Sequence, residues 1–375
     1  MNSIPPFDLT EQYKLIGEEV GAAVLEVLAS GRYIGGSPVE QFEQQFAQFV
    51  GTAHGIACNS GTDALYLALR SLNIGAGDEV ITTPFTFVAT AETVSAVGAT
   101  PVFVDIDAAT FNLNLDQVEA AITDRTKAII PVHLFGQPVD MTRVMEIAQK
   151  HHLSVIEDCA QSTGAEWNGA KVGSIGHVGC FSFFPTKNLG ACGDGGAITT
   201  NDPTIASRVR MLRDHGQYQR YRYEEVGVNS RLDAVQATIL LIKLRYLNQW
   251  NAQRQTIADR YTQLLQPLPG IQSPQTIAGG TSVWNQYTIR VLSKGKLSHE
   301  RDRVRQRLQE RQVSSMIYYP IPLHLQPVYA SLGYQPGQLP VSEQMAQEVL
   351  SLPMFPELSP LQQDQIVYAL KDSLQ

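Results

Sequence analysis

The feature that most constrains the fold is a regular alternation of apolar, β-branched runs with amphipathic stretches between about residues 55 and 200. Apolar residues recur at helical spacing in the stretches between several of these runs. Strands separated by helices in this way predict an α/β fold with a mainly parallel seven-stranded sheet and helices on both faces. The expected strands are residues 55–59, 79–83, 101–105, 127–132, 154–158, 180–184 and 196–200.

The alternation stops after about residue 230. Residues 232–265 have the spacing of one long helix, and a strand-like run follows at residues 284–292. A chain of 375 residues is long enough for more than one domain. We therefore expect a large α/β domain at residues 1–245 and a smaller C-terminal α+β domain at residues 246–375.

Composition argues against several classes of protein. Basic residues number 28 and acidic residues 36, so the net charge of −8 gives no support to a nucleic-acid partner. We find no apolar run approaching the roughly 18 residues of a membrane helix, and no secretory signal pattern at the first residues. The four cysteines form no Cys-x-x-Cys pair and the eight histidines no His-x-x-x-His pair. We expect a cytoplasmic protein with reduced thiols and no metal site.

Residues 59–65 leave the first expected strand and open an amphipathic helix. Ser60 is a good N-cap and Gly61 permits a tight turn. The free N–H groups at the start of this helix, together with the helix dipole, would bind an anion such as phosphate. The alternative is an ordinary capped helix.

Two further segments carry candidate chemical groups. The strand at residues 154–158 ends in Asp158, a carboxylate that could hold a protonated ring nitrogen at the carboxyl edge of the sheet. Lys187 follows an aromatic strand and enters a glycine-rich loop, where a lysine can lose its proton and bond a carbonyl. The alternatives are that Asp158 caps a turn and that Lys187 is a surface lysine.

Taken together, the three segments offer a group for each functional part of pyridoxal 5′-phosphate (PLP). They would bind its phosphate, its ring nitrogen and its aldehyde respectively. In the same order along the chain, the sequence resembles the DegT/StrS-type nucleotide-sugar aminotransferases, which have the fold type I aspartate-aminotransferase architecture. The resemblance covers nearly the whole chain, and its blocks are residues 60–65, 77–82, 131–133, 156–158, 181–188 and 227–233.

The resemblance implies a role for each residue around the cofactor ring. Lys187 would hold PLP as an internal aldimine and move the proton, and Asp158 would pair with the pyridinium nitrogen. Gln161 would contact the 3′-oxygen of the ring, and Phe87 would stack on its face. The reaction would pass through pyridoxamine phosphate.

The resemblance also implies how the phosphate is held. The backbone amides of Thr62 and Asp63 and the hydroxyl of Ser182 would bind it, at the turn made by Gly61. Asn229 would reach the phosphate of a neighbouring subunit, so a homodimer with shared active sites is implied.

The substrates implied by the resemblance are glutamate and a nucleotide-linked keto-sugar. Arg231, Tyr318, Tyr319 and His324 would contact the sugar substrate. The form of residues 323–327 favours amination at C3 of the sugar, with C4-keto-sugar and keto-cyclitol aminotransferases as alternatives.

Three other functions compete with this one. A regulatory protein of the same fold that only binds a ligand would be expected to lose Lys187 or Asp158, and both are present. The dehydratase branch of the family has histidine where Lys187 stands. A nicotinamide dehydrogenase needs Gly-x-Gly-x-x-Gly after an early strand, and we find no such run there.

Overall fold

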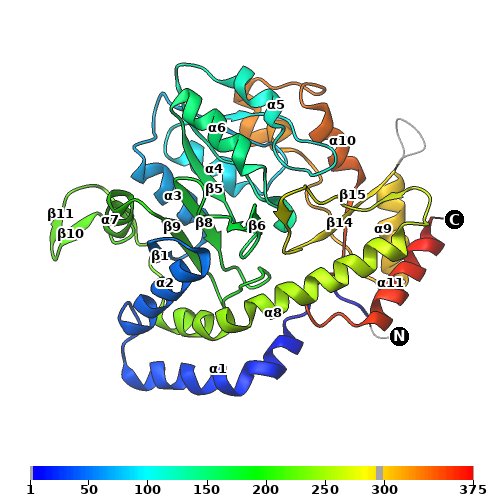
Figure 1. The fold of residues 1–375 in the computed structure, drawn as a ribbon, viewed down its shortest axis with the longest axis horizontal. Coiled ribbons are helices and arrows are strands. Elements are labelled where there is room, and N and C mark those ends of the chain that lie inside the picture. Colours follow the sequence, from blue (N-terminus) through cyan, green and yellow to red (C-terminus); the bar gives the residue numbers. More distant parts are fainter. Residues whose placement is uncertain (1–2, 293–298, 375) are drawn as a thin grey trace.

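A seven-stranded sheet forms the centre of the molecule (Figure 1). The computed structural model describes residues 3–292 and 299–374. The strand order is β1-β9-β8-β5-β4-β2-β3, and each strand overlaps one predicted from the sequence. The strands are β1 (His54–Cys58), β2 (Glu79–Thr82), β3 (Thr100–Phe103), β4 (Thr126–Ile129), β5 (Ser154–Asp158), β8 (Val178–Ser182) and β9 (Gly196–Thr200).

The sheet is mainly parallel, as predicted. Strand β2 runs parallel to β3 and β4, β4 to β5, and β5 to β8, whereas β9 is antiparallel to both β8 and β1. The carboxyl ends of β5 and β8 therefore meet at one edge, where Asp158 lies opposite Cys180. This edge is where α/β sheets place ligands.

Helices cover both faces because alternate strand residues point to opposite sides. Ile156 belongs to the apolar core formed with α3 (Gly61–Ser71), α4 (Ala89–Ala96) and α7 (Pro203–Leu212). Val155 and Phe181 point to the opposite face. That face is covered by α2 (Ser37–Val50), α5 (Leu115–Val118), α6 (Met141–His151) and α8 (Ala234–Leu265).

Helix α8 runs along one side of the molecule and belongs to two apolar cores (Figure 1). Leu240 and Leu247 pack beneath the large sheet, whereas Ile257 and Tyr261 belong to a second core. The division expected at residues 245 and 246 thus falls inside one continuous helix. Helix α1 (Thr10–Ser30) packs alongside α8.

The second core surrounds a small antiparallel sheet in the C-terminal part of the chain. Its antiparallel sheet has the order β12-β14-β15, and Ile4 from the other end of the chain packs into the same core. Its elements are β12 (Ile271–Gln272), β14 (Tyr287–Val291), α9 (Glu300–Glu310), α10 (Pro340–Glu348), β15 (Val349–Leu352) and α11 (Pro360–Ser373).

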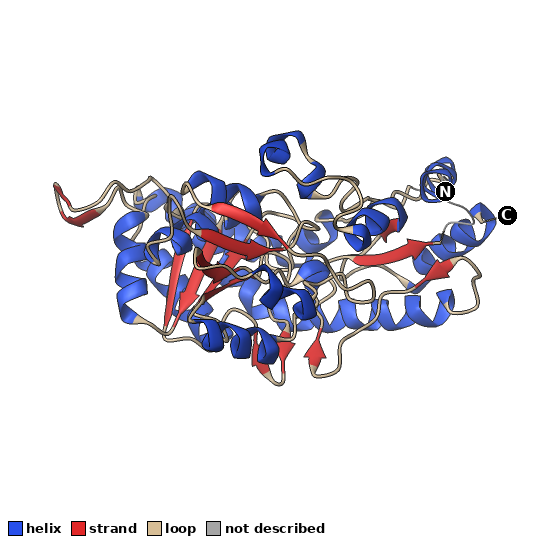
Figure 2. Ribbon diagram, turned by 90° about the horizontal axis from the view of Figure 1, so that it is seen from above, coloured by secondary structure: helices blue, strands red, loops and turns tan. Residues whose placement is uncertain are grey.

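Two small sheets complete the structure. One joins β13 (Gly280–Thr281) to β6 (Glu166–Trp167) and β7 (Ala170–Lys171). The other is a hairpin of β10 (Gln217–Gln219) and β11 (Arg222–Tyr223) that stands away from the body of the molecule (Figure 2). Among the helices in residues 3–292 and 299–374, none combines the length and apolar character needed to span a bilayer.

Candidate active site

A cavity of about 340 Å³ opens at the carboxyl ends of β5 and β8. It brings together the three segments that the sequence analysis singled out separately. Nine of the predicted site residues line it, namely Gly61, Thr62, Phe87, Asp158, Gln161, Ser182, Lys187, Tyr318 and Tyr319.

The start of α3 forms one wall of the cavity. A Cβ atom on Gly61 would lie 2.6 Å from Cβ of Ser182, so only glycine lets β8 approach the helix this closely. Within the described part of the chain, the N–H groups of Gly61 and Thr62 have no hydrogen-bond partner. Ser182 Oγ accepts a hydrogen bond from Phe184 N–H at 3.3 Å, which leaves its own proton available. This wall can therefore bind an anion.

Asp63 does not take the place expected for it. Its N–H donates to Oγ of Ser60, the N-cap of α3, at 3.1 Å, and Asp63 does not line the cavity. The capping bond consumes the amide that the sequence analysis had assigned to a phosphate. The open donors are one residue earlier, at Gly61 and Thr62.

Asp158 is fixed at the end of β5 by its backbone and its carboxylate. Its N–H donates to Pro131 O at 2.9 Å, and its carbonyl accepts from His133 N–H at 3.1 Å. Oδ1 accepts from Ala160 N–H at 3.1 Å, and Oδ2 accepts from the Thr90 hydroxyl at 2.8 Å. Burial raises the pKa of Asp158, and the bond from Thr90 acts against that rise. The carboxylate is therefore held in one orientation beside the cavity.

Lys187 has the properties of a nucleophilic amine. Burial lowers its pKa to about 8, with the charge of Asp158 acting in the opposite direction. Its loop is anchored because Asn188, the next residue, donates to Asn251 Oδ1 at 2.7 Å and to Val283 O at 2.8 Å. A neutral amine is accordingly available to Lys187 at mildly alkaline pH.

Gln161 presents its amide nitrogen to the cavity. Its Oε1 accepts from Phe135 N–H at 2.7 Å, so Nε2 is the atom on the other side, where it donates to the Tyr319 hydroxyl at 3.3 Å. One Nε2 proton remains for a ligand oxygen. Phe87 lines the cavity with 58% of its surface exposed, so its side chain is accessible to a ligand.

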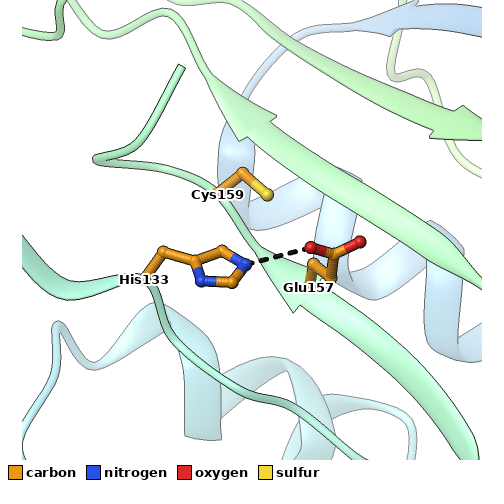
Figure 3. Close-up of side chains that lie close together, drawn as sticks. All are labelled: His133, Glu157 and Cys159. Carbon is orange, nitrogen blue, oxygen red and sulfur yellow. Dashed lines mark hydrogen bonds and ion pairs between the residues drawn. The ribbon is translucent and has the colours of Figure 1, made fainter. Parts of the chain in front are cut away.

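A second polar cluster lies on the other side of β5 and is not part of the cavity (Figure 3). His133 Nδ1 accepts from Val139 N–H at 3.0 Å, so the ring carries its proton on Nε2 and donates it to Glu157 at 3.1 Å. Glu157 also accepts from three backbone N–H groups, those of Gly173, Ile175 and Gly176. Burial raises the pKa of the Cys159 thiol beside them. The nitrogen and oxygen atoms of this cluster are thus committed to hydrogen bonds within the chain.

Besides Asp63, three predicted residues lie outside the cavity. Asn229 is exposed and forms a β-bridge with Asp214, whose carboxylate also pairs with Arg231 at 2.9 Å. His324 is only 2% exposed, and its Nε2 lies 3.1 Å from Glu343. The structure does not bring Arg231 or His324 to the cavity of their own chain, because each is held by a neighbouring carboxylate.

The cavity is also lined by polar residues that sequence reasoning did not assign to the site: Ser60, Thr86, Thr90, Thr186, Asp194 and Gln286. None of them has a sequence motif of its own that would assign it to a binding site. Thr86 and Thr90 follow the carboxyl end of β2, and that position at the ligand edge of a parallel sheet was the available signal.

The residues present fit PLP, the cofactor that the resemblance implies. The open amides and Ser182 suit its phosphate, Asp158 suits a protonated ring nitrogen, and Lys187 suits its aldehyde. The remaining proton on Gln161 Nε2 suits the ring oxygen.

Comparison with known proteins agrees with this fit. The model of the DegT/DnrJ/EryC1/StrS aminotransferase family matches residues 14–371. A protein of Geobacillus stearothermophilus named as a pleiotropic regulatory protein is 49% identical over 367 residues, with 97% of each chain covered. A UDP-N-acetyl-3-dehydro-alpha-D-glucosamine 3-aminotransferase of Acidithiobacillus ferrooxidans is 46% identical, with 99% of this chain and 98% of the relative covered.

Solved structures show the same fold. The crystal structure of S. venezuelae DesV in complex with a ketimine intermediate superposes with a TM-score of 0.96 at 43% sequence identity. The match covers 100% of this chain and 99% of DesV. The fold type I architecture expected from the sequence is therefore confirmed.

Proposed function

This chain belongs to the DegT/DnrJ/EryC1/StrS aminotransferase family, and from that premise we propose that it transfers an amino group from glutamate to a keto group of a nucleotide-linked sugar. The chain is a PLP-dependent aminotransferase. The observation that carries the proposed roles is that Lys187, Asp158 and Gln161 line one cavity.

Each residue would have a distinct task in this reaction. Bound PLP supplies an aldehyde that bonds amines and a ring that withdraws electrons. Lys187 Nζ, whose pKa burial lowers to about 8, would in its neutral form take the proton from the α-carbon of glutamate and pass it to the cofactor. In the second half-reaction the same atom delivers a proton to the sugar carbon that receives nitrogen. Asp158 holds the ring nitrogen protonated, and the Gln161 amide orients the ring oxygen.

We propose C3 of the sugar as the position that receives the amino group. The relative from Acidithiobacillus ferrooxidans is named as a 3-aminotransferase of a UDP-linked 3-dehydro sugar. Tyr318 and Tyr319 line the cavity and remain our candidates for sugar contacts. A C4-keto sugar and a keto-cyclitol are the competing acceptors.

The first half-reaction is tested by the visible spectrum of the purified protein with added PLP. We expect an absorption band that bleaches when glutamate is added and that is absent from Lys187→Ala. A wild-type protein without a lysine-dependent band would overturn the proposed role of Lys187. It would favour a ligand-binding regulatory function, to which the name of the Geobacillus relative also points.

The second half-reaction is tested by adding keto acceptors to the bleached protein. Nucleotide-linked 3-keto sugar should restore the band, whereas the 4-keto sugar and the keto-cyclitol should restore it slowly or not at all. Faster recovery with either alternative would overturn the assignment to C3.

We further propose that the active protein is a cytoplasmic homodimer whose active sites are shared. Among the described residues that line the cavity, Lys187 is the only cation, and it is accompanied by Asp158 and Asp194. The phosphate and the carboxylates of Asp158 and Asp194 would together carry more negative charge than Lys187 offsets, which favours a further donor from a partner subunit. Asn229 is exposed, and it follows the β10–β11 hairpin, on which Tyr221 is 75% exposed. An isolated two-stranded hairpin is marginally stable, which favours a partner subunit as its support.

Sharing is tested by mixing two inactive variants, Lys187→Ala and Asn229→Ala, after brief unfolding and refolding together. Mixed dimers would contain one intact site, so up to about a quarter of the wild-type activity should return. Failure to recover activity, with exchange of subunits verified by mass, would contradict shared sites.

A further inference from the structure

Two threonine hydroxyls form a chain of hydrogen bonds that ends at the carboxylate of Asp158. Thr90 Oγ1 is 2.8 Å from Asp158 Oδ2, and Thr86 Oγ1 is 3.0 Å from Thr90 Oγ1. Thr90 lies in the first turn of α4, and Thr86 precedes the same helix. Thr86 is 3% exposed and Thr90 is 1% exposed, so both side chains are almost wholly buried.

The direction of both hydrogen bonds follows from the chemistry of the groups. An ionised carboxylate can only accept hydrogen bonds, so the single hydroxyl proton of Thr90 must be donated to Asp158. The oxygen of Thr90 is then an acceptor, and the proton between the two threonines belongs to Thr86. The row therefore points every hydroxyl dipole at the carboxylate, and hydrogen bonds in such rows strengthen one another.

The carboxylate needs this support because it is buried. Removal from water disfavours its charged form, and the Thr90 bond is the largest effect that acts against burial. The amide of Ala160 and a positive charge on Lys187 act in the same direction as Thr90. Among these, the Thr90 hydroxyl is the one that contacts Oδ2.

We propose that Thr90, supported by Thr86, is a positioning residue that keeps Asp158 ionised and directed at the ring nitrogen of the cofactor. The proposal rests on the pairing of Asp158 with that nitrogen in the proposed function. Without the hydroxyl, the carboxylate becomes a stronger base and takes the proton from the ring.

The test measures cofactor binding by equilibrium dialysis in a Lys187→Ala background, where no covalent bond masks the ring contact. Thr90→Val should raise the dissociation constant for PLP about tenfold, and Thr90→Ser should restore tight binding. Thr86→Val should have a smaller effect in the same direction. In a second experiment, on protein that keeps Lys187, Thr90→Val should move the pH midpoint of the visible absorption band of bound PLP upward. The reason is that a neutral ring withdraws fewer electrons than a protonated ring.

A PLP analogue with a carbon in place of the ring nitrogen distinguishes a role of Thr90 in orienting Asp158 toward that nitrogen from a role in shaping the cavity. In the Lys187→Ala background, the protein that keeps Thr90 and the Thr90→Val variant should bind this analogue equally well. Equal loss of affinity for PLP and for the analogue would mean that Thr90 only shapes the cavity, and would overturn the proposal.

Two reference variants distinguish the possible failures. Thr93→Val removes another buried hydroxyl of α4, which donates to the carbonyls of Ala89 and Thr90 and has no other partner in residues 3–292 and 299–374, and it should leave the affinity unchanged. If Asp158→Asn weakens PLP binding and Thr90→Val does not, the role of Thr90 is refuted and the proposed function stands. If Asp158→Asn has no effect either, the pairing of Asp158 with the ring nitrogen fails as well.

Discussion

Two adjacent carboxylates, those of Glu157 and Asp158, lie on opposite faces at the end of β5 and differ in how completely they are hydrogen-bonded. Glu157 accepts hydrogen bonds from His133 and from three backbone N–H groups of residues 173–176. Asp158 accepts from one amide and one hydroxyl and lines the cavity. A carboxylate has about four lone-pair sites, so Glu157 is saturated whereas Asp158 keeps capacity for a ligand.

The difference teaches that burial alone does not identify a functional acid on this strand. Both side chains are almost wholly buried, at 0% and 5% exposure. The protein satisfies Glu157 internally, and we infer that the saturated face stabilises the strand. The unsaturated face is left for chemistry.

The largest expected effect comes from Asp158→Asn. The neutral amide cannot keep a ring nitrogen protonated. The activation free energy of glutamate-dependent bleaching should therefore rise by about 3–4 kcal/mol, which lowers the rate about 10² to 10³-fold. The melting temperature of the cofactor-free protein should stay unchanged or rise, since a buried charge is removed. A large loss of stability with little loss of rate would reverse our assignment of the two faces.

Glu157→Gln tests the other face. The new amide nitrogen would bring donors against N–H groups that now donate to Glu157, so the free energy of unfolding should fall by about 3 kcal/mol. Chemical denaturation of the cofactor-free protein measures it, with Glu146→Gln on the exposed face of α6 as the matched control. Unchanged stability together with lost activity would place Glu157 among the functional groups.

His133→Phe should have a smaller effect on stability, about 1–2 kcal/mol. It removes the donor to Glu157 and leaves Val139 N–H without its acceptor. A double-mutant cycle with Glu157→Gln should give a coupling of roughly 1 kcal/mol. Additive effects would show that the two side chains act independently.

The smallest predicted effect concerns pH. Capture of PLP requires a neutral Lys187, so its rate should rise with pH around a midpoint of about 8, below the roughly 10.4 of a free lysine. Asp158→Asn should lower this midpoint, because the charge of Asp158 raises the pKa of Lys187. Glu157→Gln should leave it unchanged. Stopped-flow absorbance across pH measures the midpoint, and equal shifts in both variants would erase the contrast between the two acids.

The same shift has a consequence for stability with a defined sign. The unfolded chain keeps Lys187 protonated to about pH 10.4, whereas the folded chain releases the proton near 8. Stability of the cofactor-free protein therefore rises with pH between these values. Lys187→Met should flatten that rise in thermal melts.

Much of the fold could be predicted because the strands are apolar and separated by helices. The expected run at residues 154–158 coincides with β5, and that at 196–200 coincides with β9. The reversed direction of β9 was not predicted, since it depends on the short connection through residues 183–195 and not on strand composition. The long helix expected at residues 232–265 is α8.

The candidate site was predictable where chemistry is concentrated in short segments. Lys187 and Asp158 have unusual neighbours, and the resemblance assigned their roles. Thr90 could not be found in this way, because its contact with Asp158 joins residues 68 positions apart. The amide of Asp63 was misassigned because the sequence does not say which helix donor the Ser60 cap will use.

The shared helix α8 makes the two cores mechanically dependent on each other. At 1.5 Å per residue, its 32 residues extend about 48 Å without an interruption that could act as a hinge. Loss of the C-terminal core would strip half of the helix of its apolar partners and weaken the half beneath the large sheet. The intact protein should therefore melt as one cooperative unit. Cleavage of the chain after residue 245 should yield two fragments that fold only when they associate.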